Sequence, residues 1–116
     1  ATGYLITRGG KSLFYTGDTG PGLAAAWEHI SPHLLVTEMS GPNRLAERMG
    51  QARHFTPQSL GVELAQIRKL KGYLPRIVLV HLPPLALEEV AAEVKAMARE
   101  LGTSITLARE GMRLRL

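Results

Sequence analysis

The segment from Ile77 to Leu82 is the feature that most restricts the fold of this chain. Every residue in it except His81 is apolar, and a pair of prolines follows directly. A continuous apolar run of this length, closed by residues that end regular structure, is typical of a central strand that is buried on both faces. Helices must cover such a strand, so the sequence predicts an α/β fold.

Helical and strand patterns alternate along the rest of the chain. Gly9-Gly10 between two apolar runs indicates a hairpin, Thr56-Pro57 is typical of a helix start, and Gly72 of a helix end. The predicted elements are a hairpin of residues 4–7 and 12–16, a short helix near 23–30, a strand of 33–39, a helix from Thr56 to Gly72, the strand of 77–82, an amphipathic helix that ends at Gly102, and a terminal hairpin of 105–108 and 112–116. Together they predict helices packed on a mixed sheet.

Composition limits the function classes. The chain has 116 residues, enough for a single domain, and no cysteine, so a metal would be held by His, Asp or Glu. It has no apolar run long enough to span a membrane and no signal segment, and we expect a cytoplasmic protein without a membrane partner. The formal charge of +4 favours a phosphate-bearing partner, and an arginine-rich surface explains the same charge equally well.

Four polar residues stand where predicted elements end or begin. Asp18 follows one strand, Glu38 lies near the end of the next, His81 lies at the end of the apolar strand, and His54 precedes a helix. Catalytic groups of α/β proteins collect at the carboxyl ends of strands. If these strands share a direction, three of the four residues therefore lie at one edge of the sheet.

Each of these residues also has an ordinary structural interpretation. Asp18 can be a turn residue, and His54 can flank its helix without a further role. Glu38 can pair with an arginine such as Arg44 or Arg53. His81 can be a core histidine that is satisfied by a backbone carbonyl. Only their order along the chain raises the functional interpretation above these alternatives.

That order resembles the metallo-β-lactamase fold, and within it the branch of class II cyclic-nucleotide phosphodiesterases and ribonuclease Z. The similar segments are Phe14-Tyr15-Thr16-Gly17-Asp18-Thr19-Gly20, Thr37-Glu38-Met39-Ser40, His54-Phe55-Thr56-Pro57 and Ile77-Val78-Leu79-Val80-His81-Leu82-Pro83-Pro84. The resemblance covers the chain from about Tyr4 to its end. Pro83 and Arg53 depart from the phosphodiesterase pattern, in which a basic residue and a glycine stand at these positions.

The resemblance implies that residues 1–116 form the C-terminal half of a four-layer αββα sandwich, with a mixed sheet and helices on one face. The family's H-x-H-x-D-H motif, which supplies most of its metal ligands, does not occur in this sequence. We therefore expect the N-terminal half to be absent from this chain, and the chain to be inactive by itself. Its uncovered sheet face would then bind the missing half or a second copy.

The resemblance also implies a chemistry for the complete domain. Two metal ions, zinc or alternatively manganese or iron, would be bridged by Asp18, and His81 would ligate one of them. The metals would activate a hydroxide that attacks a phosphodiester or another small-molecule substrate. His54, oriented by Glu38, would act as the catalytic acid.

A non-catalytic function stays open beside this one. The chain can be an α/β interaction module or an oligomerising half-domain, with a nucleic acid as the less favoured partner. Only 5% of its residues are aromatic, so the sequence offers no evident stacking platform for bases.

Overall fold

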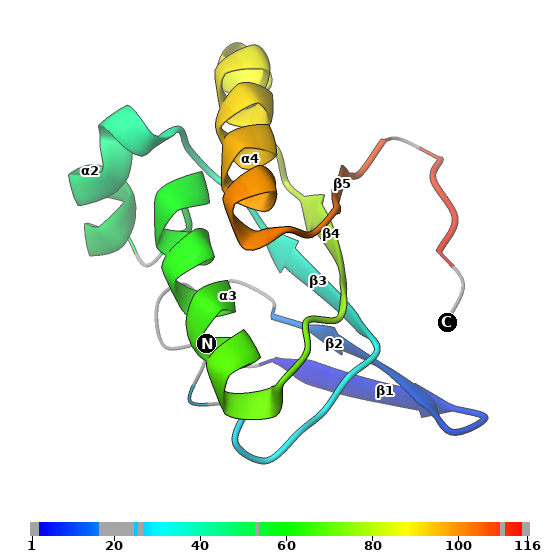
Figure 1. Cartoon of the computed structure of the whole chain (residues 1–116). Helices are drawn as coiled ribbons and strands as arrows, with labels where there is room; N and C mark the ends of the chain where they lie inside the picture. The colour runs from blue at the N-terminus through cyan, green and yellow to red at the C-terminus, as the bar shows by residue number, and fades with distance from the viewer. Residues whose placement is uncertain (1–2, 17–24, 26, 53, 110, 115–116) are drawn as a thin grey trace.

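The computed structural model describes residues 3–16, 25, 27–52, 54–109 and 111–114. Over these residues the chain forms a five-stranded mixed sheet with helices packed against it (Figure 1). The α/β fold class and the mixed sheet expected from the sequence are therefore confirmed.

The strands lie side by side in the order in which they occur in the chain. They are β1 (Tyr4–Arg8), β2 (Lys11–Tyr15), β3 (Leu34–Glu38), β4 (Arg76–Val80) and β5 (Ile105–Leu107). The first pair is antiparallel, and every later neighbouring pair is parallel. The carboxyl ends of β2, β3, β4 and β5 consequently meet at one edge of the sheet, which is the condition that the sequence argument required.

The β1–β2 hairpin closes as Gly9-Gly10 predicts. Arg8 pairs with Lys11 across a turn of two glycines, whose φ angles are 59° and 81°. A two-residue turn with positive φ at both positions matches the right-handed twist of the strands it joins, and glycine adopts it without steric cost.

Two long helices cover one face of the sheet, α3 (Pro57–Lys71) and α4 (Leu87–Leu101). Thr56 caps α3 with its side chain, which accepts a hydrogen bond from the Ser59 N–H, and the Ser59 hydroxyl in turn accepts a bond from the Thr56 N–H. Gly72 ends the helix in the left-handed conformation. The start and end predicted for this helix are thus confirmed, because local capping chemistry determines both.

The main core lies between the sheet and these helices. It combines inward-facing strand residues with one stripe from each helix, namely Phe14, Leu35, Ile77 and Leu79 with Leu60, Leu64, Ile67, Val90, Val94 and Met97. A smaller cluster on the other face contains only Leu34, Val36 and Val78, with Leu13, Tyr15, Val80 and Ala108 partly buried beside it. The strands β2, β3 and β4 therefore carry apolar residues on both faces, although the two long helices cover only one.

The terminal hairpin predicted from the sequence is wrong. Ile105–Leu107 forms β5, which pairs in parallel with β4, and Ala108 continues this pairing through a bond to the Leu79 carbonyl. Residues 112–114 form no strand, and 115–116 lie outside the described residues. The buried backbone of β4 offers β5 a full row of hydrogen-bond partners, which a short exposed hairpin cannot match.

A second difference concerns residues 43–51, which we expected to be an irregular polar stretch. They form a 3₁₀ helix, η1 (Asn43–Leu45), and a short helix, α2 (Ala46–Gln51), neither of which buries a residue. Without an apolar stripe the periodicity that identifies a helix is missing. The short helix expected near residues 23–30 is not seen at residues 27–30, which form a turn and a bend, and residues 23, 24 and 26 lie outside the described residues.

No helix in the described part of the chain is both long enough and apolar enough to cross a membrane.

The capping of α3 gives a direct test of this local account. Replacing Thr56 with Ala should lower the free energy of unfolding by about 1 kcal/mol, because the first turn of the helix loses its side-chain acceptor. Thr106→Ala, at an exposed strand position, is the matched control and should change stability by less than about 0.5 kcal/mol. Urea denaturation measures both, and equal effects would contradict the capping role.

Candidate functional site

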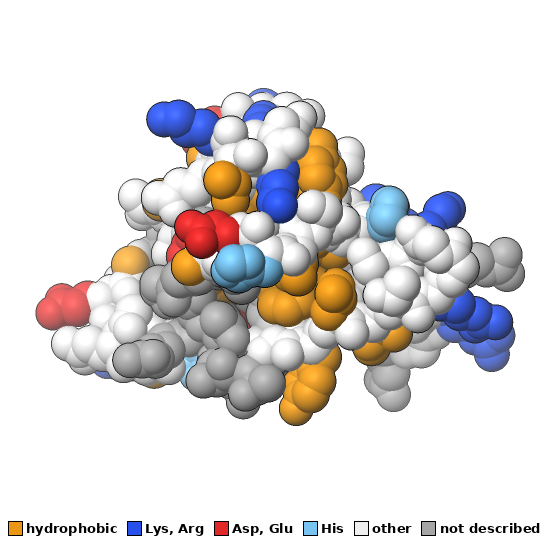
Figure 2. Space-filling view, turned by 90° about the horizontal axis from the view of Figure 1, so that it is seen from below, with side chains coloured by type: hydrophobic (Ala, Val, Ile, Leu, Met, Phe, Trp, Pro, Cys, Tyr) orange, Lys and Arg blue, Asp and Glu red, His pale blue; other side chains and the backbone are white. Residues whose placement is uncertain are grey.

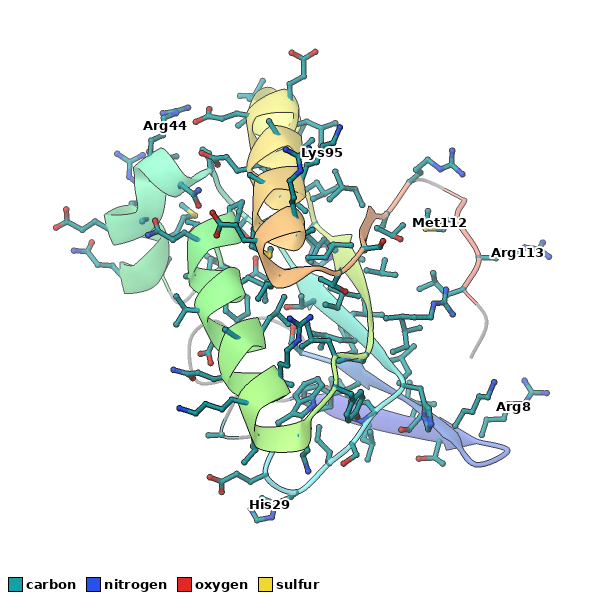
Figure 3. All side chains as sticks on the ribbon, in the orientation of Figure 1. Arg8, His29, Arg44, Lys95, Met112 and Arg113 are labelled. Atoms are coloured by element: carbon teal, nitrogen blue, oxygen red, sulfur yellow. The ribbon has the colours of Figure 1, made fainter. Side chains whose placement is uncertain are left out.

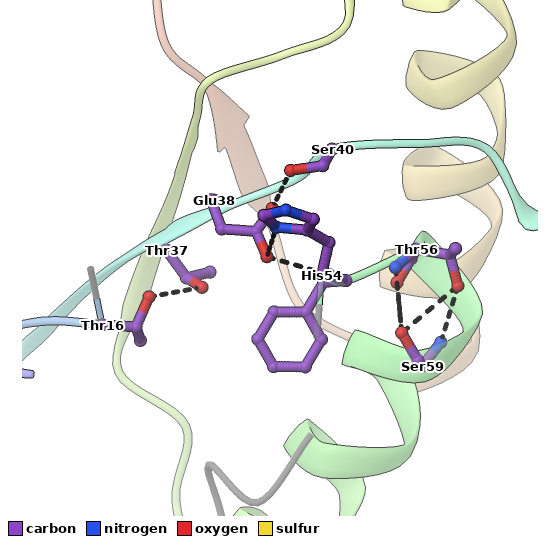
Figure 4. A network of polar contacts seen from close by, with 8 residues as sticks. Thr16, Thr37, Glu38, Ser40, His54, Thr56 and Ser59 are labelled. Atoms are coloured by element: carbon purple, nitrogen blue, oxygen red, sulfur yellow. Dashed lines mark hydrogen bonds and ion pairs between the residues drawn. The ribbon is translucent and has the colours of Figure 1, made fainter. Parts of the chain in front are cut away.

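The carboxyl edge of the parallel strands gathers most of the buried polar side chains. Thr16 directly follows β2, Thr37 and Glu38 end β3, and Thr56 caps the neighbouring helix α3. All four are at most 1% exposed. Buried polar groups persist only where partners satisfy them, so this edge contains a defined network rather than a solvated surface (Figure 4).

The Glu38 carboxylate is the centre of this network. Its Oε1 accepts a hydrogen bond of 2.9 Å from the Phe55 N–H, and its Oε2 accepts one from the Ser40 hydroxyl. The Phe55 carbonyl in turn accepts a bond of 3.2 Å from the Ser40 N–H. The end of β3 and the segment that leads into α3 are thereby joined through side chain and backbone.

His54 lies against the same carboxylate. Its Nδ1 is 3.6 Å from Glu38 Oε1, and its side chain is 35% exposed. This nitrogen is buried, and within the described residues it has no hydrogen-bond partner. Nδ1 therefore points inward toward the carboxylate, and a movement of less than an ångström would bring it to hydrogen-bond distance.

This orientation determines which ring nitrogen is available for chemistry. A proton on Nδ1, held toward Glu38, leaves Nε2 on the outward side of the ring. A histidine arranged in this way can accept or donate a proton at Nε2 while the carboxylate stabilises the charged imidazolium. The pair thus has the geometry of an acid–base group, in a loose form that is common in the absence of substrate.

Two threonines join the neighbouring strand to this edge. Thr16 Oγ1 donates a hydrogen bond of 2.9 Å to Thr37 Oγ1, and both side chains are fully buried. The backbone N–H of Thr16 also donates to the Val36 carbonyl at 3.1 Å. These two hydrogen bonds fix the position of Thr16 at the end of β2, two residues before Asp18 in the sequence.

His81 follows β4, next to the end of β3 in the sheet. The β3–β4 register pairs Glu38 with Val80, and the Met39 N–H donates to the Val80 carbonyl at 3.0 Å. His81 is exposed and has a φ of 54°, the only positive φ among the described non-glycine residues. The interpretation of His81 as a core histidine is therefore wrong. Strained backbone of this kind is concentrated at functional sites.

Arg44 lies in a different environment from the one expected. Its Nε contacts both carboxylate oxygens of Glu89, at 3.0 and 3.1 Å, and so joins η1 to α4 (Figure 3). Arg44 is thus not the partner of Glu38. Asp18 and Arg53, the other residues of the predicted site, lie outside the described residues.

The Glu38 carboxylate already has partners within the fold, because each of its oxygens accepts a hydrogen bond from an N–H or O–H donor. No group of three or more His, Asp or Glu residues that could hold a metal ion occurs in the parts of the chain that the structure describes. His81, exposed at the edge, is a suitable single ligand.

The sequence argument paired His54 with Glu38 only through the family resemblance and missed the contacts that hold the two segments together. The connection runs through the Phe55 backbone and the Ser40 hydroxyl, and backbone hydrogen bonds leave no mark on residue patterns. The buried Thr16–Thr37 pair was also missed. Its only signal is that a threonine stands at the end of each of two apolar strands.

Comparisons of the chain with protein-family models, with curated proteins and with solved structures gave no significant match.

Glu38 should prove essential to the fold through its acceptor atoms. Glu38→Ala leaves the Phe55 N–H and the Ser40 hydroxyl without their buried acceptor, and should cost roughly 3 kcal/mol of unfolding free energy. Glu38→Gln keeps the shape and one acceptor oxygen, and should cost about 1 kcal/mol. Urea denaturation of both variants tests this, and a similar loss in both would show that the charge, not the hydrogen bonding, dominates.

The positive φ of His81 should lower the stability of the fold. Since glycine adopts positive φ without the Cβ clash, His81→Gly should raise the free energy of unfolding by roughly 0.5–1 kcal/mol. His29→Gly, at another exposed histidine, is the control and should not stabilise, because glycine there only adds freedom to the unfolded chain. A loss of stability in His81→Gly would mean that the imidazole makes a structural contact.

Proposed function

We propose that this chain is the C-terminal half of a two-metal hydrolase domain that cleaves phosphodiesters. The observation that carries the proposal is the Glu38–His54 pair at the carboxyl edge of the parallel strands, with the buried Nδ1 facing the carboxylate and the ring partly exposed. An interaction module has no need to hold a buried carboxylate against a histidine whose other nitrogen remains available.

In this mechanism His54 protonates the leaving group. The protonated imidazole gives its Nε2 proton to the departing alkoxide, while its Nδ1, 3.6 Å from Glu38 Oε1, faces the carboxylate. Glu38 itself keeps both oxygens bonded to the Phe55 N–H and the Ser40 hydroxyl, so the ring is positioned without moving the carboxylate. This preorganisation means that little reorganisation is needed at the moment of proton transfer.

Asp18 and His81 are the proposed metal ligands of this chain. The metals, zinc or alternatively manganese or iron, would supply the activated hydroxide. His81 follows β4 at the same edge as Glu38, and Asp18 follows Thr16, which is fixed to Thr37 at that edge. The remaining ligands must come from outside this chain, so we propose that the chain alone is inactive.

The sheet supports the half-domain part of the proposal. Its face away from the helices carries Leu34, Val36 and Val78, together with the partly buried Leu13 and Tyr15. Leu34, Val36 and Val78 are already at most 8% exposed there, so a second sheet packed on this face to complete a four-layer sandwich would mainly cover the partly buried Leu13 and Tyr15. The same contact would bring the missing ligands toward the carboxyl edge.

In the complete domain, His54→Ala should lower kcat for a phosphodiester with an alkoxide leaving group by roughly 10²–10⁴-fold, because proton transfer to that group is lost. It should lower kcat far less for bis-p-nitrophenyl phosphate, whose p-nitrophenolate leaves without a proton, and should leave metal content unchanged. Asp18→Ala should abolish turnover and lower metal content. His29→Ala, an exposed histidine outside the edge, is the control and should leave both unchanged.

Metal content and turnover, measured together, test the role of each residue in this proposal. Loss of metal in His54→Ala would make His54 a ligand instead of an acid. Near-normal turnover in Asp18→Ala would refute the bridging role. Tight, stoichiometric zinc in the 116-residue chain alone would show that the site is complete without another half.

A further inference from the structure

Strand β1 presents an open edge with unusually exposed apolar residues. It lies at the end of the strand order, and among the described residues it pairs only with β2. All five of its residues are exposed, including Tyr4 at 58%, Leu5 at 47% and Ile6 at 54%. Figure 2 views the molecule from the side where β1 lies in Figure 1, and shows hydrophobic side chains across the middle of that surface and Lys or Arg side chains toward one end.

This edge lacks the usual protection against pairing. Natural edge strands are short, bulged, interrupted by proline or charged in the middle. The β1 sequence Tyr-Leu-Ile-Thr-Arg is rich in strand-forming residues, contains no proline, and pairs with β2 in continuous register without a bulge. Its only charge is Arg8, which lies at the tip of the hairpin (Figure 3). An edge of this kind is a template for another strand.

The hairpin geometry determines which backbone groups face outward. Across a two-residue turn, the flanking pair Arg8–Lys11 exchanges both hydrogen bonds, and bonded pairs then alternate along the strands. Tyr4, Ile6 and Arg8 thus direct their N–H and C=O groups toward β2. Leu5 and Thr7 direct theirs toward the open edge.

We propose that β1 pairs with β1 of a second copy of this chain, antiparallel and centred on Ile6. In this register Leu5 lies opposite Thr7 of the second copy and Thr7 opposite Leu5, so every outward backbone group of both residues is bonded. Ile6 faces Ile6 across the two-fold axis. The two sheets then continue into each other.

Charge and side-chain chemistry select the same register. Antiparallel pairing centred on Ile6 brings each Arg8 opposite Tyr4 of the other copy, where the guanidinium can stack on the phenol ring. Parallel pairing in register would bring Arg8 opposite Arg8, and like charges opposite each other are unfavourable. The two-fold register bonds the outward backbone groups of Leu5 and Thr7 in both copies and places no two charges opposite each other, and such self-complementarity favours a second copy over an unrelated peptide.

This inference does not depend on the proposed hydrolase function. The open edge belongs to β1, whereas the candidate site lies at the carboxyl ends of β2, β3 and β4. Five residue pairs form a small contact, so we expect a concentration-dependent dimer with a dissociation constant in the micromolar range or weaker.

Disulfide trapping tests the register directly, since the chain contains no cysteine of its own. Ile6 and its copy would form a non-hydrogen-bonded pair, with Cα atoms about 4.5 Å apart, which suits a disulfide. Under mild oxidation Ile6→Cys should therefore form a covalent dimer at least about tenfold faster than Val62→Cys, because pairing raises the effective concentration. Val62 is the matched control, an apolar residue of α3 that is 56% exposed.

Sedimentation equilibrium supplies the second measurement. The unmodified chain should dimerise as concentration rises, and Ile6→Lys should weaken the dimer about tenfold or more, because two lysines then face each other. Val62→Lys should leave it unchanged. Three outcomes would each overturn the proposal: a chain that stays monomeric, a dimer that tolerates Ile6→Lys, or covalent dimerisation of Ile6→Cys that is no faster than that of Val62→Cys.

Discussion

The buried carboxylate of Glu38 is the interaction on which the carboxyl edge of this structure depends. It terminates a strand whose residues are all buried, and accepts hydrogen bonds from the Phe55 backbone and the Ser40 side chain. Phe55 is itself fully buried and lies just before the capped start of α3. One side chain therefore sets the position of a strand end, of a major helix and of the His54 ring between them. An unpaired carboxylate at this depth would be very costly, so these contacts form together.

The fold could be predicted from the sequence wherever local chemistry decides the structure. The glycine pair of the hairpin, the Thr56 cap and the Gly72 end act within a few residues, and the apolar run of β4 has no other stable environment than a covered sheet. The prediction failed at β5, where the choice between a local hairpin and a parallel neighbour depends on a strand about 25 residues earlier. It also failed at α2, which buries nothing and so shows no periodicity.

The candidate site was predictable in its members and not in its connections. Glu38, His54 and His81 could be singled out by their positions at the ends of elements. The resemblance already implied that Glu38 orients His54, but the Phe55 and Ser40 contacts of Glu38, and the pairing of Arg44 with Glu89, follow from how η1, α3 and α4 pack around the end of β3. Packing of that kind depends on long-range contacts that no single segment encodes. The positive φ of His81 is likewise a property of the turn after β4, and histidine carries no glycine-like signal for it.

The identity between strand order and chain order has a consequence for how this molecule is made. Each strand adds beside the one synthesised just before it, so the sheet can extend stepwise as the chain leaves the ribosome, without waiting for a distant segment. Growth proceeds at one side only, from β2 toward β5. Among the described strands β1 is synthesised first, and none of those that follow reaches its outer side. A newly made molecule therefore exposes the open edge of β1, which we propose to pair with a second copy, before its core is complete. Folding and association then compete directly at high local concentrations.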